Sequence, residues 1–260
     1  MLINYEKVTA HLQDIRTGKI KEGLTLGLSE IDTYFRFKPS SFNIILGHSN
    51  TGKTTIVLYL MLAYAIKHQL KWLIFSSENE AYSIIRKLVE LLDLCKVIKD
   101  AWDYQGLLID PYNSLIKDPK LIGSVGGHEY DYQATTELRI FAKKNNIAVW
   151  VNTHANTNAL RITHRIDHEY AGHPIPPNAA DVEGGGKFVN RADDFLVVHR
   201  YIQHPTEFMY SMIHVRKVKE TETGGRPTNI DEPIRLKALR NNVGFSVDNI
   251  SILKKIVQPF

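Results

Sequence analysis

Short apolar runs alternate with segments of helical periodicity along the first part of the chain. The runs that predict buried strands are 42–47, 72–76, 107–110 and 147–152. The segments that predict helices lie between and after them, at 54–68, 83–94 and 133–145. Continuously apolar strands separated by helices are typical of a parallel sheet that is covered on both faces. The pattern therefore predicts an α/β fold with a mostly parallel central sheet and helices on both faces.

The pattern changes after Thr153. Residues 155–187 are rich in Asn, His, Pro and Gly and show little periodicity, which predicts a long loop of a kind that is often functional. Three later runs, at 195–202, 209–218 and 234–239, predict strands again. We expect these strands to form a β-rich C-terminal edge of the same sheet.

Residues 4–16 carry apolar positions at the spacing of a short amphipathic helix ahead of the first strand. We therefore expect an N-terminal arm or linker helix over 1–21 and one domain over 22–260. A total of 260 residues suits one large α/β domain, and 43% hydrophobic residues exclude a largely disordered chain.

Charge and cysteine content narrow the setting. The net charge of +4 permits nucleic-acid binding but does not argue for it. The single cysteine, Cys95, excludes an internal disulfide framework and favours a reducing cytoplasm. The longest apolar run, 56–66, is too short to span a bilayer, so we expect no membrane partner.

The strongest chemical motif follows the first strand, where residues 47–54 fit the phosphate-binding pattern GxxxxGK[ST] between a strand and a helix. Glycines let backbone N–H groups turn toward phosphates, and the helix N-terminus adds a positive dipole end. In this pattern Lys53 contacts the β- and γ-phosphates of ATP or another NTP, and the Thr54 hydroxyl ligates Mg²⁺. The residues that we expect around the nucleotide are Gly47, His48, Ser49, Asn50, Thr51, Gly52, Lys53, Thr54 and Thr55.

Two carboxylates follow apolar strands. Asp110 ends the strand at 107–110, and a carboxylate there lies at the sheet edge where ligands bind, so we expect it to hold Mg²⁺ through water. Glu78 follows the second strand and is placed to polarise the attacking water. Glu80 competes for that role, and spacing alone leaves a solvated loop glutamate as an equal alternative.

Five motifs in order carry a family resemblance: 47–54, Phe75-Ser76-Ser77-Glu78, Leu108 to Asn113, Asn152-Thr153-His154, and the strand from Ala192 to Arg200. Together, over roughly residues 22–240, the chain resembles the RecA-like motor of DnaB-type replicative helicases. That family includes phage primase-helicases and the mitochondrial helicase Twinkle. The resemblance implies a RecA-like P-loop NTPase fold.

The resemblance also implies a function. It suggests a hexameric ring that hydrolyses NTP between subunits, moves on single-stranded DNA, and uses a primase and a loader supplied by other chains. It implies that His154 senses the γ-phosphate, that Arg200 packs against the nucleotide base, and that Glu78 ranks above Glu80.

The cation that reaches into the neighbour's site departs from the family pattern. The family has a Lys-x-Arg pair on a late strand. Here Lys217 matches the lysine, and Lys219 stands where the arginine is expected. A lysine neutralises charge but lacks the planar fork of a guanidinium. Lys219, Arg216 and Arg226 therefore stay open as the trans-acting cation, as does weak hydrolysis.

The 155–187 loop corresponds to the family's DNA-contacting pore loop. It offers Asn156, Arg161, Arg165 and Lys187 for single-stranded DNA, and such contacts follow the backbone without reading bases. Two other functions remain compatible with the sequence. One is a RecA/RadA-like recombination ATPase that forms filaments on single-stranded DNA. The other is a nucleotide-switched scaffold or loader with weak turnover.

Overall fold

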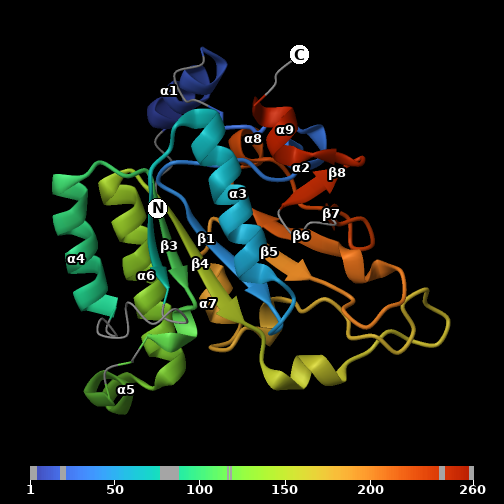
Figure 1. Ribbon diagram of the computed structural model, residues 1–260. Helices are drawn as coiled ribbons and strands as arrows, with labels where there is room; N and C mark the ends of the chain where they lie inside the picture. Colours follow the sequence, from blue (N-terminus) through green and yellow to red (C-terminus); the bar gives the residue numbers. More distant parts are fainter. Residues whose placement is uncertain are drawn as a thin grey trace.

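The computed structural model describes residues 5–17, 22–76, 88–115, 117, 119–239 and 244–257. Its centre is a nine-stranded sheet in the order β2-β3-β4-β1-β5-β6-β7-β8-β9 (Figure 1). Every strand that the apolar runs predict is present in it.

Five strands form the parallel part of the sheet. They are β1 (Phe42–Gly47), β2 (Trp72–Ser76), β3 (Gly106–Asp110), β4 (Ala148–His154) and β5 (Asp194–His199). Their pairing is parallel throughout, with β1 between β4 and β5. The predicted α/β class, with a mostly parallel sheet, is confirmed.

The remaining strands pair antiparallel and extend the sheet beyond β5. They are β6 (Tyr210–Val218), β7 (Ile234–Ala238), β8 (Phe245–Val247) and β9 (Ile250–Ser251). This is the predicted β-rich C-terminal edge. The strands β8 and β9 and the helix after them, α9 (Ile252–Val257), were not predicted, because elements this short carry no readable periodicity.

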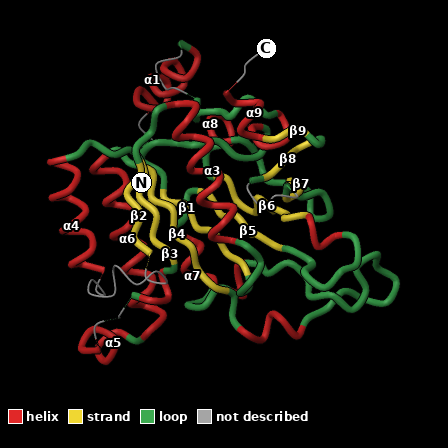
Figure 2. The backbone as a smooth tube through the Cα atoms, in the orientation of Figure 1, coloured by secondary structure: helices red, strands yellow, loops and turns green. Residues whose placement is uncertain are grey.

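Helices cover both faces of the sheet (Figure 2). On one face α3 (Lys53–His68) and α9 pack against side chains such as Ile45 and Trp150. On the other face α4 (Leu88–Ala101), α6 (Gly127–Asn145) and α7 (Gly186–Asn190) enclose a second apolar core. The smaller helices are α1 (Tyr5–Arg16), α2 (Ser29–Asp32), α5 (Pro119–Val125) and α8 (Thr221–Gly224).

Several predicted boundaries were wrong. Helix α6 begins at Gly127 instead of 133, because its first turns bury a polar residue, Asp131, which Lys117 and Tyr112 bind from a distant segment. Helix α4 continues to Ala101 instead of 94. Strand β5 ends at His199 instead of 202, since tight turns follow at once.

The 155–187 segment is mostly loop, with short 3-10 helices η3 (Thr157–Arg161) and η4 (Ala179–Asp181). Helix α1 lies within the predicted 4–16 span, while the division into an arm over 1–21 and a domain over 22–260 stays a prediction. No helix in the described part of the chain is both long and apolar enough to cross a membrane.

Candidate nucleotide-binding site

The phosphate loop is built by backbone conformations that its sequence supplies. Asn50 and Gly52 adopt left-handed φ angles of 63° and 79°, and the Thr51 hydroxyl donates to the His48 carbonyl over 2.9 Å. A Cβ on Gly47 would lie 2.7 Å from the Val198 carbonyl oxygen, so strand β5 excludes a larger residue there. The loop then leads directly into α3, whose N-terminal amides suit an anion.

Lys53 is drawn toward the end of β4. The residue is almost fully buried, and its ammonium donates to the Thr153 carbonyl over 2.9 Å and lies 3.3 Å from His154 Nδ1. In the sheet His154 stands opposite Gly47 in register. The structure thus brings together two residues, Lys53 and His154, that the sequence places about a hundred positions apart.

Asp110 lies at the same edge. Its carboxylate is buried, and one oxygen, Oδ1, accepts a 2.9 Å hydrogen bond from the Asn152 side chain. Carboxylate and hydroxyl oxygens are the ligands that Mg²⁺ prefers. Asp110, together with the half-buried Thr54 in the first turn of α3, offers such oxygens, so these residues fit the ion. Thr55 beside it is exposed, and Glu78 and Glu80 lie outside the described residues.

A cavity of 380 Å³ opens beside the phosphate loop, between residues 48–51 and the turn after β5. Arg200 lines it, as predicted for a residue that contacts the base, and its Nε donates to the Phe208 carbonyl over 2.6 Å. Two histidines, His48 and His199, also line it, with ring centroids 6.2 Å apart. No ring nitrogen of this pair has a partner at full hydrogen-bond geometry among the described residues.

Burial dominates the chemistry of this histidine pair. It lowers the pKa of His48, and it lowers the pKa of His199 to about 3, with the charges of neighbouring histidines adding to the effect on His199. Both rings are therefore neutral at physiological pH, so each presents one N–H donor and one nitrogen acceptor. The sequence predicted a phosphate-loop role for His48 but gave no role to His199.

The candidate trans-acting cations are separated by the structure. Lys219 lies directly after β6 and is about half exposed, with its Nζ 3.5 Å from Asp193 Oδ1. Lys217 instead donates to the last carbonyls of α7. Arg226 is exposed as well, but it lies over the Tyr34 ring, with its guanidinium carbon 5.7 Å from the ring centroid. Lys219 therefore combines an open head group with the position of the family's arginine, and its role stays a prediction.

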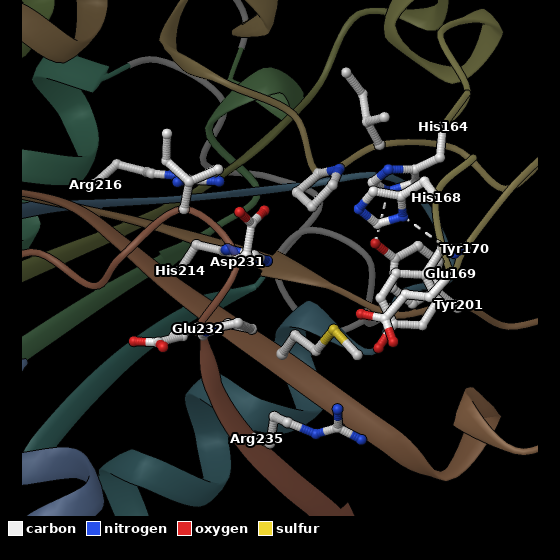
Figure 3. A pocket seen from close by; sticks show the side chains of 15 residues that line it. His164, His168, Glu169, Tyr170, Tyr201, His214, Arg216, Asp231, Glu232 and Arg235 are labelled. Carbon is white, nitrogen blue, oxygen red and sulfur yellow. Dashed lines mark hydrogen bonds between the residues drawn. The ribbon is translucent and has the colours of Figure 1, made fainter. Parts of the chain in front are cut away.

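Arg216, the fourth candidate, lines a second cavity of 480 Å³, which Tyr201 also borders (Figure 3). Figure 3 shows the rings of His164 and His168 stacked beside those of Tyr170 and Tyr201. The centroids in these two stacks are 4.0 Å and 4.1 Å apart. Burial lowers the pKa of Arg216. Sequence reasoning missed this cavity, because its walls come from segments far apart in the chain.

The predicted DNA-contacting residues occupy different parts of the long loop. Asn156 caps η3, where its side-chain oxygen accepts from the Ala159 amide. Arg161 and Arg165 are exposed, while Lys187 belongs to helix α7. The two exposed arginines are thus available to a phosphate backbone, and the assignment of all four to DNA stays a prediction.

Asn113 has a structural role that sequence reasoning missed. It was noted only as the end of the Leu108 to Asn113 motif, yet its side chain contacts both Thr153 and His154. The available signal was its polarity three residues after Asp110, in a turn at the carboxyl edge of the sheet.

Comparison with known proteins agrees with this geometry. No protein-family model matches the chain. A protein described as a chloroplastic/mitochondrial Twinkle homologue, from Arabidopsis thaliana, is 22% identical over 80% of this chain. The chain spans only about a third (35%) of that protein's length.

Two solved structures are similar to the chain. An ATPase domain of a DnaB-like helicase superposes with a TM-score of 0.68 at 12% identity, covering 92% of this chain and 96% of that domain. A DnaB-like replicative helicase, described with its interactions with primase, gives a TM-score of 0.71 at 12% identity, covering 94% of this chain and 66% of that one. The chain therefore has the RecA-like fold of DnaB-type helicase motor domains.

Proposed function

We propose that the chain is the NTP-hydrolysing motor of a replicative DNA helicase, which works as a ring and moves on single-stranded DNA. The observation that carries this proposal is the convergence of Lys53, His154 and Asp110 at one edge of a RecA-like sheet. The likeness to DnaB-type helicase domains and to a Twinkle homologue supports the choice of DNA as the track.

The chemistry assigned to each residue follows from its position. The phosphate-loop amides and Lys53 hold the triphosphate, and Lys53 then exchanges the Thr153 carbonyl for a phosphate oxygen. Mg²⁺, held by Thr54 and Asp110, offsets phosphate charge when bound. Glu78, by the family resemblance, orients the attacking water. The nucleotide base enters the 380 Å³ cavity beside Arg200.

Hydrolysis between subunits requires a cation from the neighbour. Lys219 is the proposed donor, since its head group is about half exposed just after β6, where the family has an arginine. A lysine stabilises transition-state charge without the bidentate fork of arginine. We therefore expect turnover to depend strongly on assembly into a ring, for which six subunits is the family's number.

The long loop supplies the DNA contacts. The exposed Arg161 and Arg165 contact phosphates, so binding is expected to be sequence-tolerant and to weaken as salt rises. Separate primase and loader chains are expected partners. The expected location is the cytoplasm of a bacterium or of a phage-infected cell.

The test is unwinding of a forked duplex by purified protein with Mg-ATP, with Lys53→Ala as the control variant. Mass measurement with an ATP analogue and single-stranded DNA determines the assembly. Unwinding by the wild type, absent in the variant, supports the proposal. Strand pairing without unwinding assigns the chain to recombination filaments, and nucleotide binding without turnover assigns it to a scaffold or loader.

A further inference from the structure

Asn113 binds both ends of the long loop with one side chain. Its Oδ1 accepts from the Thr153 hydroxyl over 2.9 Å and from the His154 amide over 3.1 Å, where the loop begins. Its Nδ2 donates to Glu183 Oε2 over 2.6 Å, where the loop returns to the sheet. An amide has both acceptor and donor atoms, so one Asn can make both sets of bonds at once.

Backbone bonds hold the same two chain segments side by side. The Glu183 amide donates to the His154 carbonyl over 3.2 Å, and the Asn156 amide donates to the Asp181 carbonyl over 2.7 Å. Ala155 and Val182 form an isolated antiparallel bridge between these bonds. The two ends of the loop therefore form a narrow neck, and Asn113 closes it from the side of the sheet.

The bond to Glu183 differs from the others in this neck. Glu183 is an exposed carboxylate, whereas Thr153 is fully buried. A surface side chain keeps one position only when a specific partner holds it, and a hydrogen bond to an ionised group is stronger than a neutral one. The Asn113–Glu183 bond therefore fixes the returning end of the loop to a side chain of the nucleotide edge.

The opposite end of this chain of contacts is Lys53, which donates to the carbonyl of Thr153. A phosphate that attracts Lys53 removes that bond, and the Thr153-His154 segment can then change its contacts with Asn113. We infer that Asn113 is a positioning residue that transmits occupancy of the phosphate site to the 155–187 loop through its hydrogen bond to Glu183. This inference rests on the proposed function, because it assumes that the loop binds single-stranded DNA.

The test exploits the direction of the bond. Asn113→Asp keeps the size and the acceptor oxygen that faces Thr153 and His154, but it cannot donate to Glu183. Glu183→Gln keeps an acceptor for Asn113. The double variant restores a bond with the opposite direction, since the new amide at position 183 donates to the new carboxylate at position 113. Ser114→Ala, at an exposed position of the same turn, is the matched control.

Two quantities are measured for each variant on the full chain. One is the ratio of affinities for oligo-dT with and without a non-hydrolysable ATP analogue, and the other is the stimulation of ATP hydrolysis by the same DNA. Asn113→Asp is expected to reduce both about tenfold, within the usual range of coupling between sites. Glu183→Gln and Ser114→Ala are expected to behave like the wild type, and the double variant is expected to recover most of the coupling.

Three results would overturn the inference: unchanged coupling in Asn113→Asp, a double variant no better than Asn113→Asp, or equal loss in Ser114→Ala. An absence of any DNA effect on the wild type would also overturn it. If the wild type fails to hydrolyse ATP, the proposed function falls, and the affinity ratio with the analogue still decides whether Asn113 couples the two sites.

Discussion

Two buried histidines make the stability of this domain depend on pH. His199 on β5 and His214 on β6 are 1% and 3% exposed, and burial lowers the pKa of each to about 3. The charges of His214, His48 and His164 lower the pKa of His199 further, while the Pro174 carbonyl opposes this effect. For His214 the charge of Arg216 adds to burial, and the Ile230 carbonyl opposes both.

The sign follows from which state binds protons first. In the unfolded chain a histidine has a pKa of about 6.5, so as pH falls below that value the unfolded state is protonated while the folded state is not. The free energy of unfolding is therefore whole above about pH 6.5 and falls progressively toward about pH 3. At about 1.36 kcal/mol per pKa unit, the loss between about pH 7.5 and pH 5 is about 2 kcal/mol for each histidine.

The measurement is urea unfolding of the wild type and of His199→Leu at about pH 7.5 and pH 5, followed by circular dichroism. Only the difference between the two pH values is compared, so a change in packing caused by leucine cancels. The variant is expected to lose about 2 kcal/mol less than the wild type over this interval. His204→Leu, which changes a histidine whose ring is partly exposed, is the control and is expected to match the wild type more closely.

An equal pH-dependent loss in the wild type and in His199→Leu would refute this reasoning. It would mean that the imidazole gains a proton in the folded protein near its ordinary pKa, and hence that water reaches the ring. A larger loss in the variant would mean that His199 is charged and stabilising, which is opposite to the effect of burial.

Three further predictions address the site. Gly47→Ala is expected to abolish nucleotide binding and to lower stability by about 1–3 kcal/mol, because its Cβ meets a backbone oxygen of β5; calorimetry measures both, and tight binding would contradict it. Glu78→Gln is expected to bind ATP without turnover, and retained turnover in a hydrolysis assay would move that role to Glu80. Mixing Lys53→Ala with Lys219→Ala subunits is expected to restore part of the hydrolysis that each lacks alone, whereas strictly additive rates would exclude action across the interface.

The sequence was sufficient where structure depends on local pattern. The five parallel strands are apolar runs, and the phosphate loop is a contiguous motif whose turn conformations fall on Asn50 and Gly52. Because parallel strands end at one edge, the position of Asp110 at a strand end was enough to place it near the loop. The fold and the core of the site could therefore be predicted.

The parts that could not be predicted depend on contacts between distant side chains. Asn113 and Glu183 are 70 residues apart and both lie in irregular segments, so no periodicity joins them. The neutral state of His199 depends on burial by segments on either side of it. The role of Lys219 requires a second subunit, which no pattern within one chain describes.

The two cations assigned to hydrolysis are held differently within the chain, and this difference argues for an order of events. Lys53 is buried against the Thr153 carbonyl, and a buried ammonium gives up such a partner only for a stronger one, such as phosphate. Lys219 is about half exposed, and the carboxylate oxygen nearest to it already accepts two hydrogen bonds from Arg139. An exposed ion pair of this length contributes little stability, so Lys219 can leave Asp193 without a large penalty. Nucleotide is therefore expected to engage Lys53 first and to attract the neighbour's Lys219 afterwards.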